Sequence, residues 1–270
     1  ADGVLKKPFV PPEPLINITG WQIEQWLAML YYPLVRILAL VASAPVLGHI
    51  GVPMRVKVGL ALIVTTIIAP TLPIPAHPLA SPSGMMLIAA QILIGVAMGF
   101  ALRLVISAIE LAGELIGTQM GLNFAGFFDP QTASQGTPIG AWLGLLATLL
   151  LLCANGHLMM LDAVADSFRV LPIQPDAVDL TNWKKLILFG AELFRIGLYV
   201  ALPVLGAMLV CNIGLGVLAR VAPQLNILAI GFPVTIMVGF TMLLAALPFI
   251  IVYLDATIGR ALSMGVGIVR

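Results

Sequence analysis

Hydrophobic residues occur in long continuous runs along this chain, without the strict alternation that is typical of a half-buried strand. A run needs roughly 20 apolar residues to cross the hydrocarbon core of a bilayer as a helix. Because only a helix satisfies the backbone of a single segment in lipid, the pattern predicts an all-α, membrane-associated fold with about six long apolar helices. The expected helices cover residues 27–47, 56–74, 85–102, 139–161, 186–213 and 225–254.

Prolines and charged residues interrupt these runs. Each proline removes one helix hydrogen bond and tends to kink or stop the helix. The last run is long enough to form two half-helices that are divided near Pro248. Arg36, Glu192 and Arg195 also lie inside apolar runs, where contact with lipid would cost several kcal/mol. These residues indicate that part of the apolar surface faces protein rather than lipid.

The composition supports the same fold class. Hydrophobic residues make up 60% of the chain and charged residues 9%, whereas soluble domains carry about 25% charged residues. The composition therefore excludes a soluble enzyme and a disordered tail. The formal net charge of +1 gives no indication of a basic surface that would bind nucleic acid.

Domain boundaries follow from the proline content of the amino-terminal segment. Residues 1–14 carry Pro8, Pro11, Pro12 and Pro14 and no apolar core of a signal peptide. We expect a Pro-rich tail or linker at 1–14, and a single all-α domain at 15–270.

The segment between the third and fourth apolar runs differs from the rest of the chain. Residues 103–121 have helical periodicity, with Glu110 and Glu114 on one face. An irregular polar loop follows at about 120–137, and long loops in compact domains are usually functional. Glycines flank this loop at four-residue spacing, which predicts a helix-packing stripe along which another backbone can approach closely. The stripe comprises Gly113, Gly117, Gly121, Gly136, Gly140 and Gly144.

Two carboxylate pairs are the only candidates for chemistry. Glu110 and Glu114 have no histidine or third carboxylate nearby, so a polar cavity or a partner's cations explain them better than a metal site. Asp162 and Asp166 fall where an apolar run ends, and a solvated helix end accounts for them. The chain has no Gly-x-Ser-x-Gly elbow and no phosphate-binding loop. We therefore expect no catalytic residue, no cofactor and no metal.

One segment closely resembles a known family. The sequence GELIGTQMGLNFA at 113–125, followed by Asp129 and Pro130, is similar to the FliR family of flagellar biosynthesis proteins, which has homologues in type III secretion. Further matching motifs follow in the same order: NGH at 155–157, ALP at 201–203, RVAPQLN at 220–226 and GFP at 231–233. The resemblance runs from about Leu15 to the end of the chain.

The resemblance implies a subunit of the protein-export gate in the bacterial inner membrane, at the flagellar basal body. It implies assembly with FliP-family and FliQ-family subunits around a central channel, with the FlhB-family switch protein as a further partner. Helical hairpins of the subunit would then face its neighbours and membrane lipid, and unfolded proteins would pass through the channel. No nucleic acid and no enzymatic activity are implied.

The resemblance also assigns roles to residues. The loop at about 120–137 corresponds to the family's plug, in which Phe124, Phe127 and Phe128 would fill the closed pore. Glycines of the loop would act as pivots, because glycine adopts backbone angles that other residues avoid. The expected plug residues are Met120, Gly121, Asn123, Phe124, Gly126, Phe127, Phe128, Asp129, Pro130 and Gln135. Expected polar contacts with the channel or other subunits are Glu110, Glu114, Arg220, Gln224 and Asn226.

Three alternatives stay open at this point. The first is a secondary transporter of a small solute, with Glu110, Glu114, Glu192 and Arg195 lining a site in the membrane. The second is the homologous gate subunit of a virulence injectisome, although the QMGLNFA wording at 119–125 favours the flagellum. The third is an intramembrane hydrolase that would use Asp162 and Asp166.

Overall fold

The computed structural model describes residues 20–73, 78–79, 81–124, 136–174, 180–224 and 227–267. Every regular element within these ranges is a helix, which confirms the predicted all-α fold. The expected tail at 1–14 lies outside the described residues. The elements are α1 (Gly20–Ser43), α2 (Met54–Ile68), η1 (Ala69–Thr71), α3 (Pro82–Gln119), η2 (Leu122–Phe124), α6 (Pro138–Cys153), α7 (Gly156–Val170), α8 (Leu180–Val221) and α9 (Ile227–Gly267).

The number of candidate membrane spans agrees with the number of predicted helices. Five helical segments are long and apolar enough to cross a bilayer, and the bent α6–α7 pair would make a sixth. The five are α1, residues 54–71, α3, residues 190–221 of α8 and residues 229–261 of α9.

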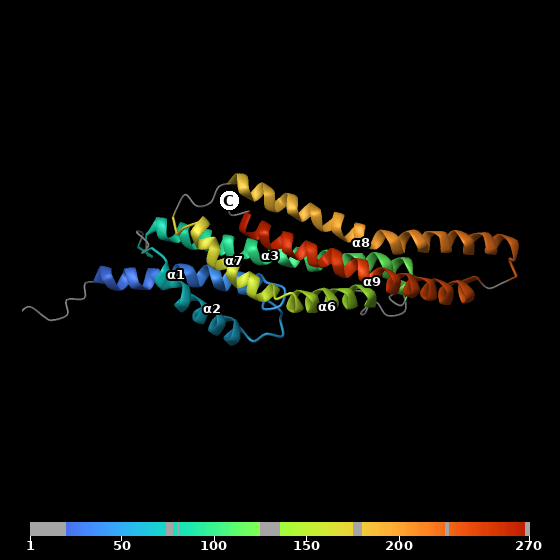
Figure 1. The fold of residues 1–270 in the computed structure, drawn as a ribbon, viewed down its shortest axis with the longest axis horizontal. Coiled ribbons are helices and arrows are strands. Elements are labelled where there is room, and N and C mark those ends of the chain that lie inside the picture. The colour runs from blue at the N-terminus through green and yellow to red at the C-terminus, as the bar shows by residue number, and fades with distance from the viewer. Residues whose placement is uncertain are drawn as a thin grey trace, which may run out of the picture.

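Helix α3 lies at the centre of the molecule, and α1, α6, α8 and α9 pack against it (Figure 1). It is 38 residues long, because no proline or loop residue separates the apolar run at 85–102 from the helical pattern at 103–121. Its start is a regular N-cap: the Ser81 hydroxyl accepts a hydrogen bond from the Gly84 amide at 3.0 Å, and Pro82 occupies the first helical turn.

Glycines bring α1 and α3 into close contact. A Cβ atom on Gly95 would lie 2.8 Å from the Ala39 Cβ and 3.0 Å from the Leu40 amide nitrogen. A Cβ on Gly99 would lie 2.9 Å from the Leu40 carbonyl oxygen. Real Cβ atoms do not approach other atoms this closely, so this crossing requires glycine at both positions.

The apolar run at 139–161 does not form the single helix that was predicted. It is divided into α6 and α7, whose axes are bent by 65°. Asn155 lies between them in the left-handed conformation, with φ 56° and ψ 26°. Asparagine is one of the few residues that adopt this conformation routinely, and a positive φ ends a right-handed helix.

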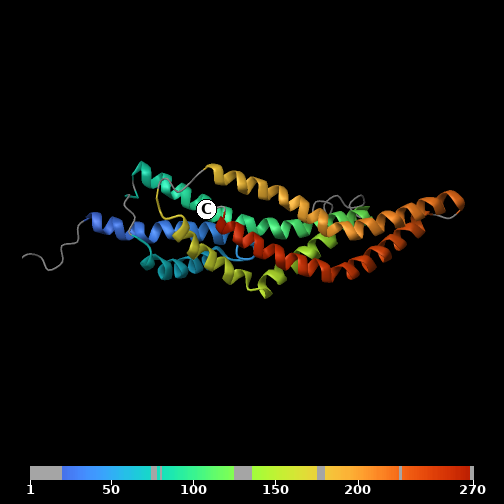
Figure 2. The same ribbon diagram turned by 45° about the horizontal axis from the view of Figure 1, so that its top comes forward.

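Helices α8 and α9 form a hairpin that extends beyond the rest of the molecule (Figure 2). The predicted division near Pro248 is wrong, because α9 is continuous over 41 residues and contains both Pro233 and Pro248. A proline removes only one hydrogen bond, and the apolar turns on either side keep the helix intact. The rings of Tyr199 and Tyr253 are 5.0 Å apart where the two helices pack together.

Candidate functional site

Two glycines of α3 bring the start of α6 against that helix. A Cβ atom on Gly113 would lie 2.6 Å from the Gly140 Cα and 2.8 Å from the Gly140 amide nitrogen. A Cβ on Gly117 would lie 2.6 Å from the Thr137 hydroxyl oxygen. Because the neighbouring atoms at Gly113 are backbone, only glycine permits this approach.

The carboxylate of Glu114 holds the first residues of α6. Both of its oxygens accept a hydrogen bond from the Thr137 amide, at 2.8 and 2.9 Å. The Thr137 hydroxyl accepts from the Gly140 amide at 3.1 Å and is the N-cap of α6. A negative charge at a helix N-terminus is stabilised by the helix dipole. The Thr-Pro pair at 137–138 is a helix-start signal that could have been found from the sequence.

The second series of glycines accommodates glutamate side chains rather than a helix backbone. Gly136 and Gly140 lie against the Glu114 carboxylate, and a Cβ on Gly144 would lie 2.6 Å from the Glu110 Cγ. Glu110 is exposed and Glu114 is half-buried. The structure therefore brings both glutamates of the predicted pair to the α3–α6 contact.

Two glycines of the expected stripe do not lie on helices. Gly121 follows the end of α3 with φ +83°, and Gly136 precedes α6 with φ +77°. Helix α3 ends before Gly121 and helix α6 begins after Gly136, so the four-residue spacing at these two positions does not lie on a helix. The left-handed backbone that both adopt is the conformation that favours glycine.

The end of α3 is also fixed by α9. Met120 is fully buried, and Gly239 leaves space for its side chain. The Thr235 hydroxyl is 3.2 Å from the Met120 carbonyl oxygen and donates to it across 115 residues of sequence. Nearby, the Asn123 side-chain amide donates to the Thr118 hydroxyl at 2.8 Å. The sequence does not single out Thr235 and Gly239, because one hydroxyl and one glycine in an apolar helix carry no recognisable pattern.

The remaining expected site residues are not brought together in the described part of the chain. Arg220 and Gln224 are exposed where α8 ends, at the hairpin tip that projects beyond α3 (Figure 1). Phe124 closes the short helix η2. The other expected residues, Gly126, Phe127, Phe128, Asp129, Pro130, Gln135 and Asn226, lie outside the described residues.

A second polar site surrounds Arg36, which is 0% exposed. Its guanidinium group donates to the Gln91 side-chain oxygen at 2.7 Å, the Ser167 hydroxyl at 3.0 Å and the Leu171 carbonyl at 3.0 Å. It also lies 4.1 Å from the centre of the Phe168 ring. The prediction that this charge faces protein is confirmed, and its partners join α1, α3 and the end of α7.

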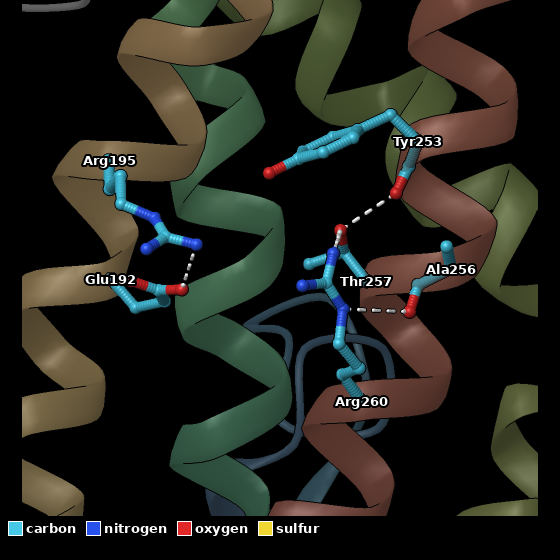
Figure 3. A network of polar contacts seen from close by, with 6 residues as sticks. All are labelled: Glu192, Arg195, Tyr253, Ala256, Thr257 and Arg260. Carbon is cyan, nitrogen blue, oxygen red and sulfur yellow. Dashed lines mark hydrogen bonds and ion pairs between the residues drawn. The ribbon is translucent and has the colours of Figure 1, made fainter.

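Three charged residues, Glu192 and Arg195 of α8 and Arg260 of α9, contact residues of their own helices on either side of α3 (Figure 3). Arg195 forms an ion pair with Glu192 at 3.0 Å. The Arg260 guanidinium donates to the Thr257 hydroxyl at 3.3 Å and lies 5.9 Å from the Tyr253 ring centre. Glu192 and Arg195 therefore neutralise one another, and Arg195 is exposed, unlike Arg36.

The carboxylates of α7 form no enclosed site. Asp162 is exposed, and Asp166 forms an ion pair of 3.4 Å with the exposed Arg169. Among the described residues, no group of three histidine, cysteine or acidic side chains could hold a metal ion.

Comparisons with known proteins identify relatives over most of the chain. The family model described as bacterial export proteins, family 1, matches residues 27–261. The flagellar biosynthetic protein FliR of Pectobacterium carotovorum subsp. carotovorum is 42% identical over 236 residues, which cover 87% of this chain and 90% of that protein. FliR of Escherichia coli (strain K12) is 41% identical over the same shares of the two chains. FliR of Bacillus subtilis (strain 168) is 30% identical over 81% of this chain and 85% of its own length.

Proposed function

This chain belongs to the FliR family, within family 1 of the bacterial export proteins, and we propose that it helps to form and plug the channel through which unfolded flagellar proteins are secreted. The chain is a subunit of the flagellar export apparatus and a membrane protein. The finer location proposed is the inner membrane at the flagellar basal body. The proposed role is structural and involves no catalysis, so energy for export would come from partner proteins.

The anchored ends of the loop between α3 and α6 carry the plug proposal. The start of the loop is held by the buried Met120, and its end is held by the Glu114 carboxylate on the Thr137 amide. Gly121 follows Met120 and Gly136 precedes Thr137, and both glycines have a left-handed backbone conformation. A loop that is fixed at both ends at one place in a membrane protein is suited to block a passage there. Phe124, Phe127 and Phe128 are proposed as the apolar bulk of the plug.

The exposed charges of α3 support a position beside a channel or another subunit. Arg103 and Glu110 are exposed within the part of α3 that qualifies as a membrane span. Contact of such charges with lipid would cost several kcal/mol, so a polar surface must cover them. We propose that Glu110 and Glu114, together with Arg220, Gln224 and Asn226, face the channel or neighbouring subunits.

Large apolar side chains are exposed along both helices of the α8–α9 hairpin, among them Leu209, Val210 and Val252. The proposed neighbours that cover them are FliP-family and FliQ-family subunits, with the FlhB-family protein as a further partner and lipid over the remainder. The small-solute transporter and the injectisome subunit are not favoured, because the relatives named above are flagellar.

Deletion of residues 123–135 in the assembled apparatus tests the plug. We expect higher ion conductance of the resting membrane, because the apolar bulk of the loop is lost while both anchors remain. Replacement of the same residues by a Gly-Ser segment of equal length should raise conductance as well, which separates loss of bulk from shortening of the chain. Unchanged conductance in both variants would exclude a plugging role. Deletion of the whole gene should abolish motility and filament protein secretion.

A further inference from the structure

Helix α9 touches the chain where α3 ends, and this contact uses two residues of one helix face. Thr235 and Gly239 are four residues apart on α9, so they point in the same direction. The Thr235 hydroxyl is 3.2 Å from the Met120 carbonyl. A Cβ on Gly239 would lie 2.7 Å from the Met120 sulfur and 2.9 Å from its Cε, and would also overlap its Cγ. We call Met120, Thr235 and Gly239 the α3–α9 joint.

The hydrogen bond of the joint satisfies a carbonyl at a helix end. The last carbonyls of a helix have no partner within that helix, and Met120 is the C-cap of α3. The Thr235 hydroxyl has a second acceptor, the Phe232 carbonyl of its own helix at 3.0 Å. The single proton is therefore shared, and its donation to Met120 is easily exchanged for donation within α9. Such a contact positions the end of α3 but is able to release it.

The two ends of the loop are held by different sets of contacts. The Thr137 end is held by α3, through Glu114 and the Gly113 carbonyl, which accepts from the Thr137 hydroxyl at 3.3 Å. The Met120 end is the C-cap of α3, where the Met120 amide donates to the Ile116 carbonyl at 2.9 Å, and α9 adds the Thr235 hydrogen bond and the space at Gly239. A displacement of α9 relative to α3 therefore removes contacts at the Met120 end and leaves the Glu114–Thr137 hydrogen bonds in place.

We propose that Thr235 and Gly239 are positioning residues through which the α8–α9 hairpin sets the start of the loop between α3 and α6. The inference rests on the proposed plugging role of that loop and adds the element that controls it. The hairpin projects beyond the other helices (Figure 2), so a neighbouring subunit or a passing polypeptide that displaces it acts on Met120 through this joint.

Single substitutions in the assembled export apparatus test the joint. Gly239→Ala displaces the Met120 side chain, and Thr235→Val removes the donor while nearly preserving side-chain volume. Both variants should raise ion conductance of the resting membrane, whereas Thr235→Ser, which keeps the hydroxyl, should not. Matched controls on α9 are Thr241→Val, whose hydroxyl donates only to the Met237 carbonyl of its own helix at 2.7 Å, and Gly259→Ala, where a Cβ would meet nothing within 4 Å. Equal conductance in the joint variants and the controls would overturn the proposal.

A reversible cross-link keeps the test decisive if Gly239→Ala fails to assemble. In the double variant Met120→Cys with Gly239→Cys, the shorter side chain at 120 makes space for the new one at 239. A Cβ at 239 would lie against the Cγ position of Met120, so two cysteines at these positions are close enough for a disulfide. Oxidation should abolish secretion and leave the membrane sealed, and a reductant should restore secretion. Variants with only one of the two cysteines are the controls, because Cys153 and Cys211 are both free.

The outcomes separate the joint from the plug. Undiminished secretion by the oxidised double variant, with the cross-link verified on a gel, would overturn the joint. If deletion of 123–135 raises conductance and the cross-link has no effect, the plug stands and the joint is wrong. If the deletion has no effect but the cross-link blocks secretion, the plugging role is wrong, and only the positioning of the loop start by α9 stands.

Discussion

Arg36 shows, at the scale of a residue, how a charge is accommodated in a protein that is 60% hydrophobic. The guanidinium group is fully buried, and its described acceptors are the neutral oxygens of Gln91, Ser167 and Leu171. Three hydrogen bonds and the Phe168 ring replace its hydration, since the side chain is shielded from solvent. The sequence predicts that this charge is buried, but its partners are 55 to 135 residues away and only the fold brings them together.

Removal of this side chain should destabilise the fold. Arg36→Met leaves buried acceptors without their donor, and we expect a loss of about 3 kcal/mol in the free energy of unfolding. The loss should appear as a lower melting temperature of the detergent-solubilised apparatus. The control is Arg195→Met, which breaks an exposed pair within one helix that contributes about 0–1 kcal/mol. Equal shifts for the two arginines would contradict the structural role of Arg36.

The Glu114 carboxylate should control local exchange at the start of α6. Glu114→Ala removes the acceptor of the Thr137 amide, so that amide should exchange its hydrogen faster with solvent. We expect a local cost of about 1 kcal/mol, as for the loss of a helix cap. Glu114→Gln keeps one acceptor oxygen and should have a smaller effect. Glu110→Ala, one turn earlier, is the control, and an equal change in exchange of the Thr137 amide would exclude a specific anchor at Glu114.

At the scale of elements, helix length separates this protein from a simple polytopic carrier. Helix α8 has 42 residues, which corresponds to about 63 Å at 1.5 Å per residue. The hydrocarbon core of a bilayer is about 30 Å thick. Long parts of α8 and α9 therefore extend beyond the hydrocarbon, where other proteins or water must surround them.

Substitution of glycine by alanine should lower stability at packed positions of the helices and raise it at open positions. Gly113→Ala places a methyl group 2.6 Å from the Gly140 Cα and should destabilise the α3–α6 contact by about 1–3 kcal/mol, as overpacking does. Gly214→Ala on α8 meets nothing within 4 Å and should stabilise its helix by about 0.5–1 kcal/mol. Melting temperatures of the two variants provide the measurement, and a lower value for both would show that Gly214 is covered by a partner.

Sequence periodicity identifies which segments are helical better than it locates their breaks. The four-residue spacing of Gly113 with Gly117 and of Gly140 with Gly144 predicts close packing, and Gly95 and Gly99 have the same spacing. The sequence does not predict the 65° bend at Asn155, because apolar residues continue on both sides of NGH at 155–157, and Pro248 lies within a continuous helix rather than at a break. The α3–α9 joint could not be predicted, since it depends on how α9 packs against α3.

At the scale of the whole molecule, apolar side chains are abundant on the outer faces. In the most apolar stretch of α8 only 22% is buried, and the same share is buried in α9. The corresponding share in α3 is 67%. Helix α3 is therefore the buried central helix, whereas the apolar side chains of the α8–α9 hairpin depend on neighbouring proteins or lipid to shield them from water.

The behaviour of the isolated chain in detergent should reflect this exposure of apolar side chains on α8 and α9. Expressed alone, it should aggregate or be degraded in detergent, because the faces of α8 and α9 lack their neighbours. Co-expression with FliP-family and FliQ-family subunits should yield a discrete complex by size-exclusion chromatography. A stable, monodisperse single chain would favour a carrier instead.

The contact between Thr235 and Met120 has a consequence for the order of biosynthesis. The two residues are 115 positions apart, and α9 follows the other described helices along the chain. Helices α1 to α8 are synthesised while the start of the loop has no support from α9. The nascent subunit therefore completes this contact only after α9 has been synthesised, which delays full positioning of the start of the loop until that point.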